Sequence, residues 1–579
     1  MNIFSNFWFF LDNKEKKFFF FIVILSIFQA LLEMIGIATV IPFITFLLKP
    51  ESFDNLSFLP KYIYFDLISQ SKFILIFCII LFSIFLIKNI IILITNNFTY
   101  KFIYLLRTKI YNKLLQKMLA QNYLFFVKKG MSKIFNATYS ESNNFAANIV
   151  RPIIHLITEF LVCFGIIILV IITGFVDGLL LILPIIVLVG LFLKKINKSI
   201  KAWSNQRIVN NENIFNLNYN LINGIKEILI YDKVKKILLN FDSVLKSAEQ
   251  VDTKNSVVVT LPRILLEQAI ILVFISIILT MSYFGNSYDN ILIILTFYLA
   301  IAYRLVPSIN KIFVAYQQIK FGKPSLPYIM EYYNLKNKIS KSHISKNQII
   351  NENKQKTLSS SIELKDVTFA YPNSDTVLKN INIKINKNEI VGIFGESGSG
   401  KSTLINILIG LIKPIKGSLY LDGNNIVSDE DVRQYQNLFS ISSQDSFLIN
   451  GSIKDNIIFG SNSEIPNDKL NEAIRNACLV NTIQDMKYGL ETDVGLTLKK
   501  LSSGQKQRIS LARCFYLNKD IMIFDEATNA LDEQNEKNIF EYIKNLKNKK
   551  TIIIVSHNLN NLKICDSIYN IKNKSLEKK

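Results

Sequence analysis

Long apolar windows appear only before residue 310 of this 579-residue chain. Crossing the hydrocarbon core of a bilayer, roughly 30 Å thick, takes about 20 apolar residues in a helix. The first half is therefore predicted to be a multi-pass α-helical membrane domain of six helices. The six windows lie at residues 18–48, 73–95, 153–176, 179–193, 264–282 and 291–306.

The composition agrees with a membrane protein that also carries a second domain. Apolar residues make up 50% of the chain and charged residues only 19%, a balance typical of proteins that span a bilayer. A chain of 579 residues is too long for one core, so at least two domains are expected. The first window is too long for a signal peptide and no small-residue cleavage site follows it, so we expect a membrane helix there.

The basic residues are spread unevenly between the windows, and this orients the domain. Residues 96–152 carry nine Lys and Arg against one acid, and residues 194–254 carry eleven more basic residues. Residues 177–178 and 284–290 contain no Lys or Arg. By the positive-inside rule the two basic loops and both termini lie in the cytoplasm, so we expect a protein of the cytoplasmic membrane. The loops account for most of the net charge of +21, and no nucleic-acid partner is expected.

Both basic loops are predicted to be helical. Apolar residues recur at helical spacing in residues 101–122 and 213–238, with Lys and Arg between them. The membrane helices are expected to continue into the cytoplasm and to turn back near residues 125–133 and 219–231. These tips either transmit movement from a second domain or are simply solvated ends of helices.

A compact α/β domain is predicted at the C-terminal end. β-Branched runs at residues 362–369, 389–394, 521–524 and 551–555 favour strands. The residues before them are rich in Lys, Asn, Ser and Gln and are interpreted as a linker. The predicted parts are the membrane domain at residues 1–333, the linker at 334–361 and the α/β domain at 362–579.

A phosphate-binding loop is predicted at residues 395–402, which read GESGSGKS and match G-x-x-x-x-G-K-[ST]. The backbone N–H groups of such a loop surround a phosphate chain, and glycine lets the backbone approach it closely. Lys401 is placed to reach the β- and γ-phosphates, and Ser402 to bind Mg²⁺. The residues expected to contact the nucleotide are Gly395, Glu396, Ser397, Gly398, Ser399, Gly400, Lys401, Ser402 and Thr403.

A second pattern supplies two carboxylates. The apolar strand at residues 521–524 ends in Asp525 and Glu526. Asp525 is placed to hold Mg²⁺, and Glu526 to orient and polarise an attacking water. Together with the phosphate-binding loop, this pair predicts that the chain binds and hydrolyses a nucleoside triphosphate.

The order of motifs between Tyr371 and His557 resembles the ATP-binding cassette, and the six-helix part resembles the exporter type of that family. The resemblance implies ATP and Mg²⁺ as cofactors and an α/β P-loop fold for the cassette. It implies that Tyr371 stacks on adenine, that Gln444 joins Mg²⁺ to the membrane domain, and that His557 contacts the γ-phosphate. Glu526 is then the catalytic carboxylate.

The segment LSSGQ at residues 501–505 resembles the family's signature LSGGQ. The chain departs from the family at Ser503, where a glycine is usual, and at Leu496, where exporters usually carry an acid. Because one chain holds one cassette, the resemblance implies a homodimer with two shared ATP sites; pairing with a different half-transporter is the alternative. The residues that would meet the partner's ATP are Ser502, Ser503, Gly504 and Gln505, with Asp532 in the loop between the cassettes.

Three cations lie in or beside the apolar windows, namely Lys88, Arg263 and Arg304. A charge inside a bilayer costs about 2.5–3.5 kcal/mol on insertion scales and usually faces a cavity. A cavity lined by these side chains suits an anionic headgroup such as a pyrophosphate. The alternative is that the cations pair with acids for structural reasons, the candidates being Glu33, Glu159 and Glu267.

Residues 257–268 and 297–312 resemble the lipid-linked oligosaccharide flippases of bacterial N-glycosylation, and residues 59–68 resemble their short outer helix. The resemblance implies ATP-driven flipping of a polyprenyl-diphosphate oligosaccharide from the inner to the outer leaflet. Lys88 departs from it, because arginine is expected there. The alternatives are an exporter of peptides, other lipids or small amphiphiles, and a regulatory ATPase on a membrane anchor. The last would need a defective Glu526 or His557, and both residues are intact.

Overall fold

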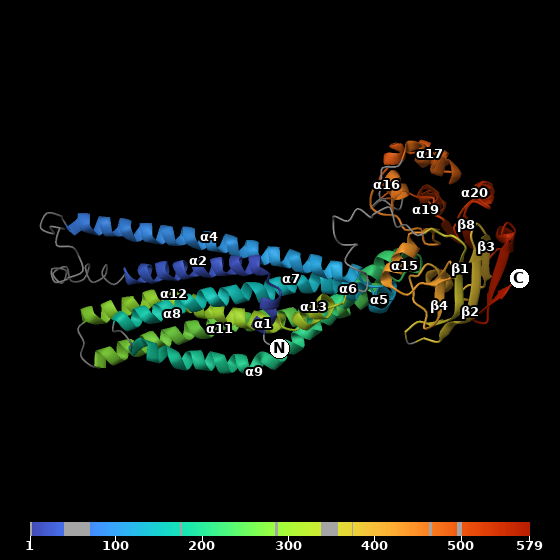
Figure 1. The fold of residues 1–579 in the computed structure, drawn as a ribbon. Helices are drawn as coiled ribbons and strands as arrows, with labels where there is room; N and C mark the ends of the chain where they lie inside the picture. Colours follow the sequence, from blue (N-terminus) through green and yellow to red (C-terminus); the bar gives the residue numbers. More distant parts are fainter. Residues whose placement is uncertain are drawn as a thin grey trace. The chain divides into compact units, whose positions relative to one another are not determined.

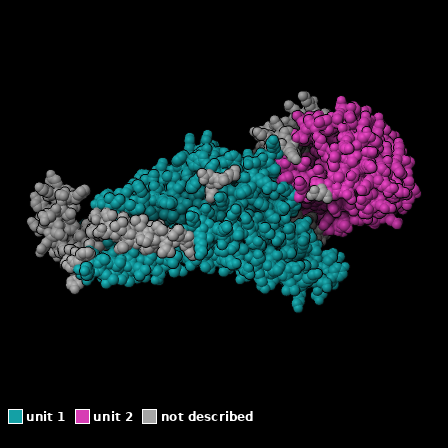
Figure 2. Space-filling model, turned by 90° about the horizontal axis from the view of Figure 1, so that it is seen from below, with its two compact units in different colours: residues 1–119, 129–336 teal, residues 120–128, 337–579 magenta. Residues whose placement is uncertain are grey.

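The computed structural model describes residues 3–39, 70–173, 177–283, 288–336, 357–372, 374–461, 466–494 and 501–579. Its internal contacts define two compact units, shown in different colours in Figure 2. Unit 1 comprises Met1–Leu119 and Lys129–Lys336, and unit 2 comprises Ala120–Lys128 and Asn337–Lys579.

Unit 1 is built from long helices that lie side by side (Figure 1). Its short helices are α1 (Ile3–Phe9), α6 (Met131–Phe135), α7 (Glu141–Phe145), α10 (Ile225–Ile230) and α13 (Ser325–Tyr333). Its long helices are α2 (Asn13–Ala38), α4 (Gln70–Leu119), α8 (Arg151–Thr173), α9 (Asp177–Asn223), α11 (Val234–Tyr283) and α12 (Tyr288–Gly322).

Each predicted apolar window falls, at least in part, in a different long helix. Four described stretches are long and apolar enough to cross a membrane, namely Asn13–Ala38, Ile74–Leu119, Met131–Ile172 and Val234–Tyr283. Many side chains of the fourth and sixth windows lie outside the described residues, so the number of six spans stays a prediction.

Helices α4 and α11 are long enough for the predicted continuation of membrane helices into the cytoplasm, which stays a prediction. Each has 50 residues, which is about 75 Å of helix and more than twice the thickness of a hydrocarbon core. The predicted second turn, near residues 219–231, is seen where α9 ends at Asn223 and α10 begins at Ile225.

The centre of unit 1 is α8. In the stretch that contains α8, 56% of the apolar window is buried, whereas none of the window in α4 is buried within this chain. Val162 and Ile166 of α8 share one buried cluster with Ala30 of α2, Leu266 of α11 and Leu305 of α12. This packing holds four long helices together.

Unit 2 contains two β-sheets and the helices around them. The antiparallel sheet has the order β2-β1-β4-β5, with β1 (Ser361–Ala370), β2 (Thr376–Asn386), β4 (Lys416–Leu421) and β5 (Asn424–Asn425). The larger sheet has the order β10-β9-β3-β8-β7-β6. Its strands are β3 (Ile390–Gly395), β6 (Phe439–Ser442), β7 (Ile521–Asp525), β8 (Thr551–Val555), β9 (Ser567–Lys572) and β10 (Ser575–Lys578).

The larger sheet is parallel from β9 to β6 and buried on both faces, which explains its apolar strands. Ile553 and Val555 of β8 belong to the core on one face, and Ile552 and Ile554 to the core on the other. The four predicted strands are confirmed as β1, β3, β7 and β8. Unit 2 also includes the segment Ala120–Lys128, where Leu124 packs against the first of these cores.

Candidate nucleotide site and membrane cations

Parallel strand order brings the predicted motifs of unit 2 to one edge of the larger sheet. β3, β8, β7 and β6 are neighbours in that order and run the same way. The phosphate-binding loop follows β3, Asp525 ends β7 and Glu526 follows it, His557 follows β8, and Gln444 follows β6. The carboxyl ends of such strands are where parallel α/β sheets bind their ligands.

The phosphate-binding loop turns sharply before α14 (Lys401–Leu408). Gly398 and Gly400 have φ angles of +80° and +103°, a region that side chains disfavour. A Cβ at Gly395 would lie 2.6 Å from Ser399 Oγ and 3.1 Å from the Ile571 carbonyl oxygen, so a larger residue would force its neighbours to shift. The glycines predicted from the pattern are therefore required by the geometry of this loop.

The Lys401 ammonium lies inside the loop and is only 8% exposed as a residue. It donates to the carbonyl oxygens of Gly395 at 2.8 Å and Glu396 at 2.9 Å. In the part of the chain that the structure describes, the buried Ser399 Oγ lacks a hydrogen-bond partner. A buried cation and an unsatisfied hydroxyl at a helix N-terminus fit a phosphate chain.

Glu526 is brought beside Lys401 and His557. Its Oε1 atom lies 3.6 Å from His557 Nδ1 and 4.0 Å from Lys401 Nζ. The residue has a φ of +48°, and its N–H donates to the Val555 carbonyl at 3.0 Å, which anchors it to β8. The fold therefore brings together three residues that are spread over more than 150 positions of the sequence.

Asp525 has a different environment from its neighbour. Burial and the nearby charge of Glu526 raise the pKa of Asp525 to about 6, against the opposing effect of Lys401. Ser402, in the first turn of α14, is exposed. In the described residues no cluster of three His, Cys, Asp or Glu side chains is suited to a metal. A site with one carboxylate and one hydroxyl fits Mg²⁺, which takes most of its other ligands from phosphate and water.

The predicted adenine-stacking residue, Tyr371, lies beside the phosphate-binding loop. Its hydroxyl is 3.2 Å from Thr403 Oγ1, and its ring meets Phe369 edge-on at 5.0 Å. Tyr371 borders a groove of about 470 Å³ whose lining also includes Gly398, Ser399 and Lys574. Sequence reasoning did not identify Lys574, because no motif marks the β9–β10 turn.

The signature segment forms the start of α19 (Ser503–Leu517). Ser502 caps this helix: its Oγ accepts from the Gln505 N–H at 3.1 Å, and the Gln505 side chain accepts from the Ser502 N–H at 2.9 Å. Ser503 is exposed in the first turn. A Cβ at Gly504 would lie 2.7 Å from the Ala530 carbonyl, so glycine is required there by a close approach of backbone.

For Asp532 and Gln444 the structure gives the local environment of each side chain. Asp532 caps α20 (Glu533–Asn545) by accepting from the Asn535 N–H at 2.9 Å, and this bond lowers the pKa of Asp532. Gln444 is exposed two residues after β6. Leu496 and residues 59–68, the predicted outer helix, lie outside the described residues. The nucleotide and metal contacts of all these residues stay predictions.

Two of the three predicted cavity cations pair with acids. The Arg304 guanidinium of α12 bonds to Glu33 of α2 and lies 3.5 Å from Glu159 of α8. Arg263 of α11 lies 2.7 Å from Glu267, one turn along the same helix. These contacts match the structural alternative for Arg304 and Arg263.

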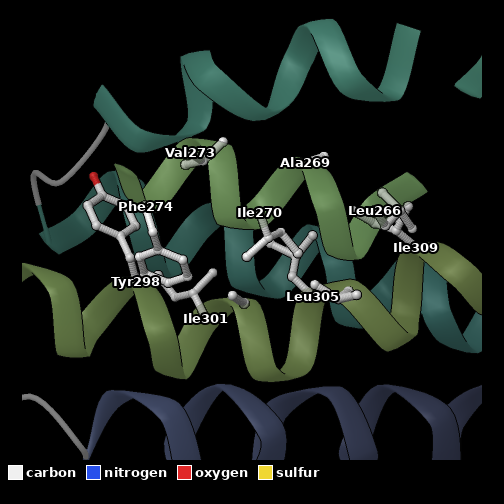
Figure 3. Close-up of a pocket in the computed structure, with 11 residues that line it drawn as sticks. Leu266, Ala269, Ile270, Val273, Phe274, Tyr298, Ile301, Leu305 and Ile309 are labelled. Carbon is white, nitrogen blue, oxygen red and sulfur yellow. The ribbon is translucent and has the colours of Figure 1, made fainter. Parts of the chain in front are cut away.

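Lys88 of α4 has an aromatic neighbour, because its Nζ lies 4.3 Å from the centre of the Phe85 ring. Beside Arg304, α11 and α12 enclose a narrow cavity of about 40 Å³. Figure 3 shows the side chains that point into it, among them Phe274, Ile301 and Leu305. The lining carries no charge, so this cavity suits hydrocarbon.

A nucleotide-binding cassette joined to a helical membrane domain defines a class of membrane transporters driven by ATP. Two family models match this chain: "ABC transporter" over residues 378–529 and "ABC transporter transmembrane region" over residues 18–305. Together they cover most of the sequence, and the chain belongs to the ABC transporter family.

Relatives and solved structures agree with this assignment. The ABC transporter ATP-binding protein y4gM of Sinorhizobium fredii is 37% identical over 207 residues, 36% of this chain and 35% of the relative. The ATP-dependent lipid A-core flippase of Blochmanniella pennsylvanica is 38% identical over 209 residues, 36% of each chain. The matches thus span about a third of these relatives' length.

The whole chain is similar in fold to a bacterial Atm1-family ABC exporter with ATP bound. The TM-score is 0.77 with 16% identity, and the match covers 96% of this chain and 95% of that one. The predicted fold class, a membrane domain fused to an ATP-binding cassette, is confirmed. The resemblance to the oligosaccharide flippases of N-glycosylation stays a prediction.

Proposed function

We propose that this chain is a half-transporter that works as a homodimer and uses ATP hydrolysis to move an anionic lipid-linked oligosaccharide across the cytoplasmic membrane. The observation that carries the ATPase part is the convergence of Lys401, Glu526 and His557 at one sheet edge, within 4.0 Å of Glu526 Oε1. In this proposal Lys401 binds the terminal phosphates and Glu526 polarises the attacking water.

The need for a second copy is supported by the signature helix. Its capped N-terminus presents N–H groups and a positive dipole end, which suit a phosphate. One chain supplies one such helix and one phosphate-binding loop, so two copies arranged reciprocally complete two ATP sites.

Exposed apolar side chains at the turn from α9 to α10 also support a partner. Ile222 is 70% exposed and Ile230 65%, and Tyr219, Leu229 and Tyr231 are exposed beside them. Apolar groups gathered on a tip that we place in the cytoplasm mark an interaction surface. The occupant we propose is the cassette of the second copy. The other predicted turn, near residues 125–133, is preceded by Leu124, which already packs in unit 2 of its own chain.

The substrate class is supported by the cations of the membrane helices. Lys88, Arg263 and Arg304 occur on α4, α11 and α12, and the hydrocarbon-lined cavity lies between two of these helices. An amphiphile with an anionic head and a long apolar tail fits cations set among apolar membrane helices, although the cavity itself is too small to hold such a tail. A relative named as a lipid A-core flippase makes a lipid substrate the first one to test.

A second candidate is an exporter of peptides, other lipids or small amphiphiles. It is favoured by the ion pairs of Arg304 and Arg263, because a cation balanced by a carboxylate attracts an anionic headgroup less strongly.

The proposed function is tested by flipping of a polyprenyl-diphosphate oligosaccharide in proteoliposomes. Wild type should flip it with ATP, and Glu526→Gln should not, because the amide cannot polarise the attacking water. Glu541→Gln makes the same change of charge at an exposed position of α20 and serves as the matched control. ATPase activity without flipping by wild type would move the substrate to the second candidate. ATPase activity retained by Glu526→Gln would reject the assignment of the base.

A further inference from the structure

The buried side chain of Gln507 bonds to both ends of the segment that follows Glu526. Gln507 of α19 donates from Nε2 to the Glu526 carbonyl at 3.4 Å and accepts at Oε1 from the Ala530 N–H at 3.0 Å. Gln507 is buried, and its two bonds are partly buried, which limits their contact with water. Both ends of residues 526–530 are thereby fixed against the signature helix.

Within this segment, the Asn529 side chain turns back onto the carboxylate. Its Nδ2 atom donates to Glu526 Oε2 at 3.0 Å. The amide nitrogen must face the carboxylate, because an amide oxygen in its place would be repelled. The other oxygen, Oε1, faces His557 and Lys401. Each oxygen of Glu526 thus has its own neighbours, and the plane of the carboxylate is defined.

We infer that Asn529 is a positioning residue of ATP hydrolysis, which orients the Glu526 carboxylate toward the attacking water. The inference rests on the proposed role of Glu526 as the base. A carboxylate without this donor can rotate about its side-chain bonds, and loss of alignment at a reacting group costs rate rather than substrate affinity. Asn529 itself needs no contact with ATP.

The test is steady-state ATPase of the full chain in nanodiscs, with kcat and KM for ATP measured separately. Asn529→Ala should lower kcat by on the order of tenfold and leave KM within about twofold. Asn529→Asp keeps the shape of the side chain but replaces the donor with a charged oxygen that repels Glu526. Its kcat should fall at least as far as that of Asn529→Ala, whereas a merely structural role would be preserved by this isosteric change.

Asn382→Ala is the matched control. The Asn382 amide also donates to a carboxylate at 3.0 Å, that of Asp366, but it lies in the antiparallel sheet. Its kcat should equal that of wild type.

Three outcomes would overturn the inference: wild-type kcat in Asn529→Ala, a raised KM with unchanged kcat, or an Asn529→Asp variant as active as wild type. A Glu526→Gln variant assayed in parallel distinguishes failure of the proposed base, Glu526, from failure of the proposed positioning residue, Asn529. If it keeps wild-type ATPase, the proposed base is wrong; if it is inactive while both Asn529 variants are normal, only the positioning role fails.

Discussion

At the scale of single residues, Asp525 and Glu526 show how adjacent carboxylates acquire different properties. Asp525 ends β7 and is largely buried, whereas Glu526 turns out of the strand with a positive φ and meets Lys401, His557 and Asn529. The sequence predicted both residues as functional, because a strand that ends in two acids after a phosphate-binding loop is specific. Asn529 and Gln507 were missed, since an amide in a loop or a helix carries no motif of its own.

Replacing Asp525 with Asn should stabilise the nucleotide-free cassette at high pH. The pKa of Asp525 is about 6 in the folded protein, above the value of about 4 for an unfolded aspartate. The folded state therefore holds the proton more tightly, and the stability that protonation contributes below pH 4 is lost as the pH rises through 6. Asn does not titrate, so Asp525→Asn should be more stable at pH 8 by on the order of 1–2 kcal/mol, allowing for partial exposure.

Labelling of Cys514 measures this effect, because its side chain is fully buried and reacts only when the cassette opens. The denaturant midpoint for labelling, read by mass spectrometry, should rise in Asp525→Asn at pH 8, and the gain should be nearly lost at about pH 3.5, where Asp525 is protonated in both states. An equal gain at both pH values would exclude titration of Asp525 as its cause.

At the scale of elements, strands were predictable where apolar runs are continuous, and this holds for β3, β7 and β8. β6 has four residues and β5 has two, too few to give a pattern, and they are strands only because a neighbour supplies hydrogen bonds. Helix α19 illustrates a second limit. Its signature glycine was predicted as a nucleotide contact, but the structure adds that Gly504 is needed for contact with the loop at Ala530.

Replacing Gly504 with Ala should therefore destabilise the cassette even without nucleotide. The new Cβ would lie 2.7 Å from the Ala530 carbonyl, and the backbone of one element has to shift. Such overpacking costs about 1–3 kcal/mol. The Cys514 labelling midpoint should fall accordingly, whereas Lys506→Ala, two positions along α19, should change it by less than about 0.5 kcal/mol. An unchanged midpoint in Gly504→Ala would show that the loop adjusts freely.

At the scale of the whole molecule, the open question is what the Arg304 charge does in the membrane unit. Arg304 joins α12 to α2 and α8 through Glu33 and Glu159, so its removal leaves the buried Glu33 without this partner, whereas Glu159 keeps Lys311 at 2.7 Å. Breaking a buried ion pair costs about 3–5 kcal/mol, which would impair transport for structural reasons alone.

A double variant that removes the charges of both Arg304 and Glu33 separates a structural role of Arg304 from a role in binding the anionic headgroup. Arg304→Gln alone should reduce both ATPase and flipping, because Glu33 is left unpaired. Arg304→Gln combined with Glu33→Gln removes both charges and should restore folding and ATPase. If Arg304 binds the anionic headgroup, flipping in proteoliposomes stays lost in the double variant. Recovery of flipping would assign Arg304 a structural role.

The sequence by itself determined the two parts of this protein, because long apolar windows allow only membrane helices and because the phosphate-binding and carboxylate motifs are local patterns of backbone and charge. It also determined which residue types stand at the ATP site. The tertiary structure alone decided which charges meet. Arg304 and Glu33 are 271 positions apart, and the sequence left open whether Arg304 faces a cavity or pairs with an acid; only the packing of α12 and α2 against α8 places it beside two acids. Likewise, only the fold of residues 526–530 against α19 places Asn529 on the carboxylate, since side-chain contacts depend on how elements pack and not on their spacing in the chain.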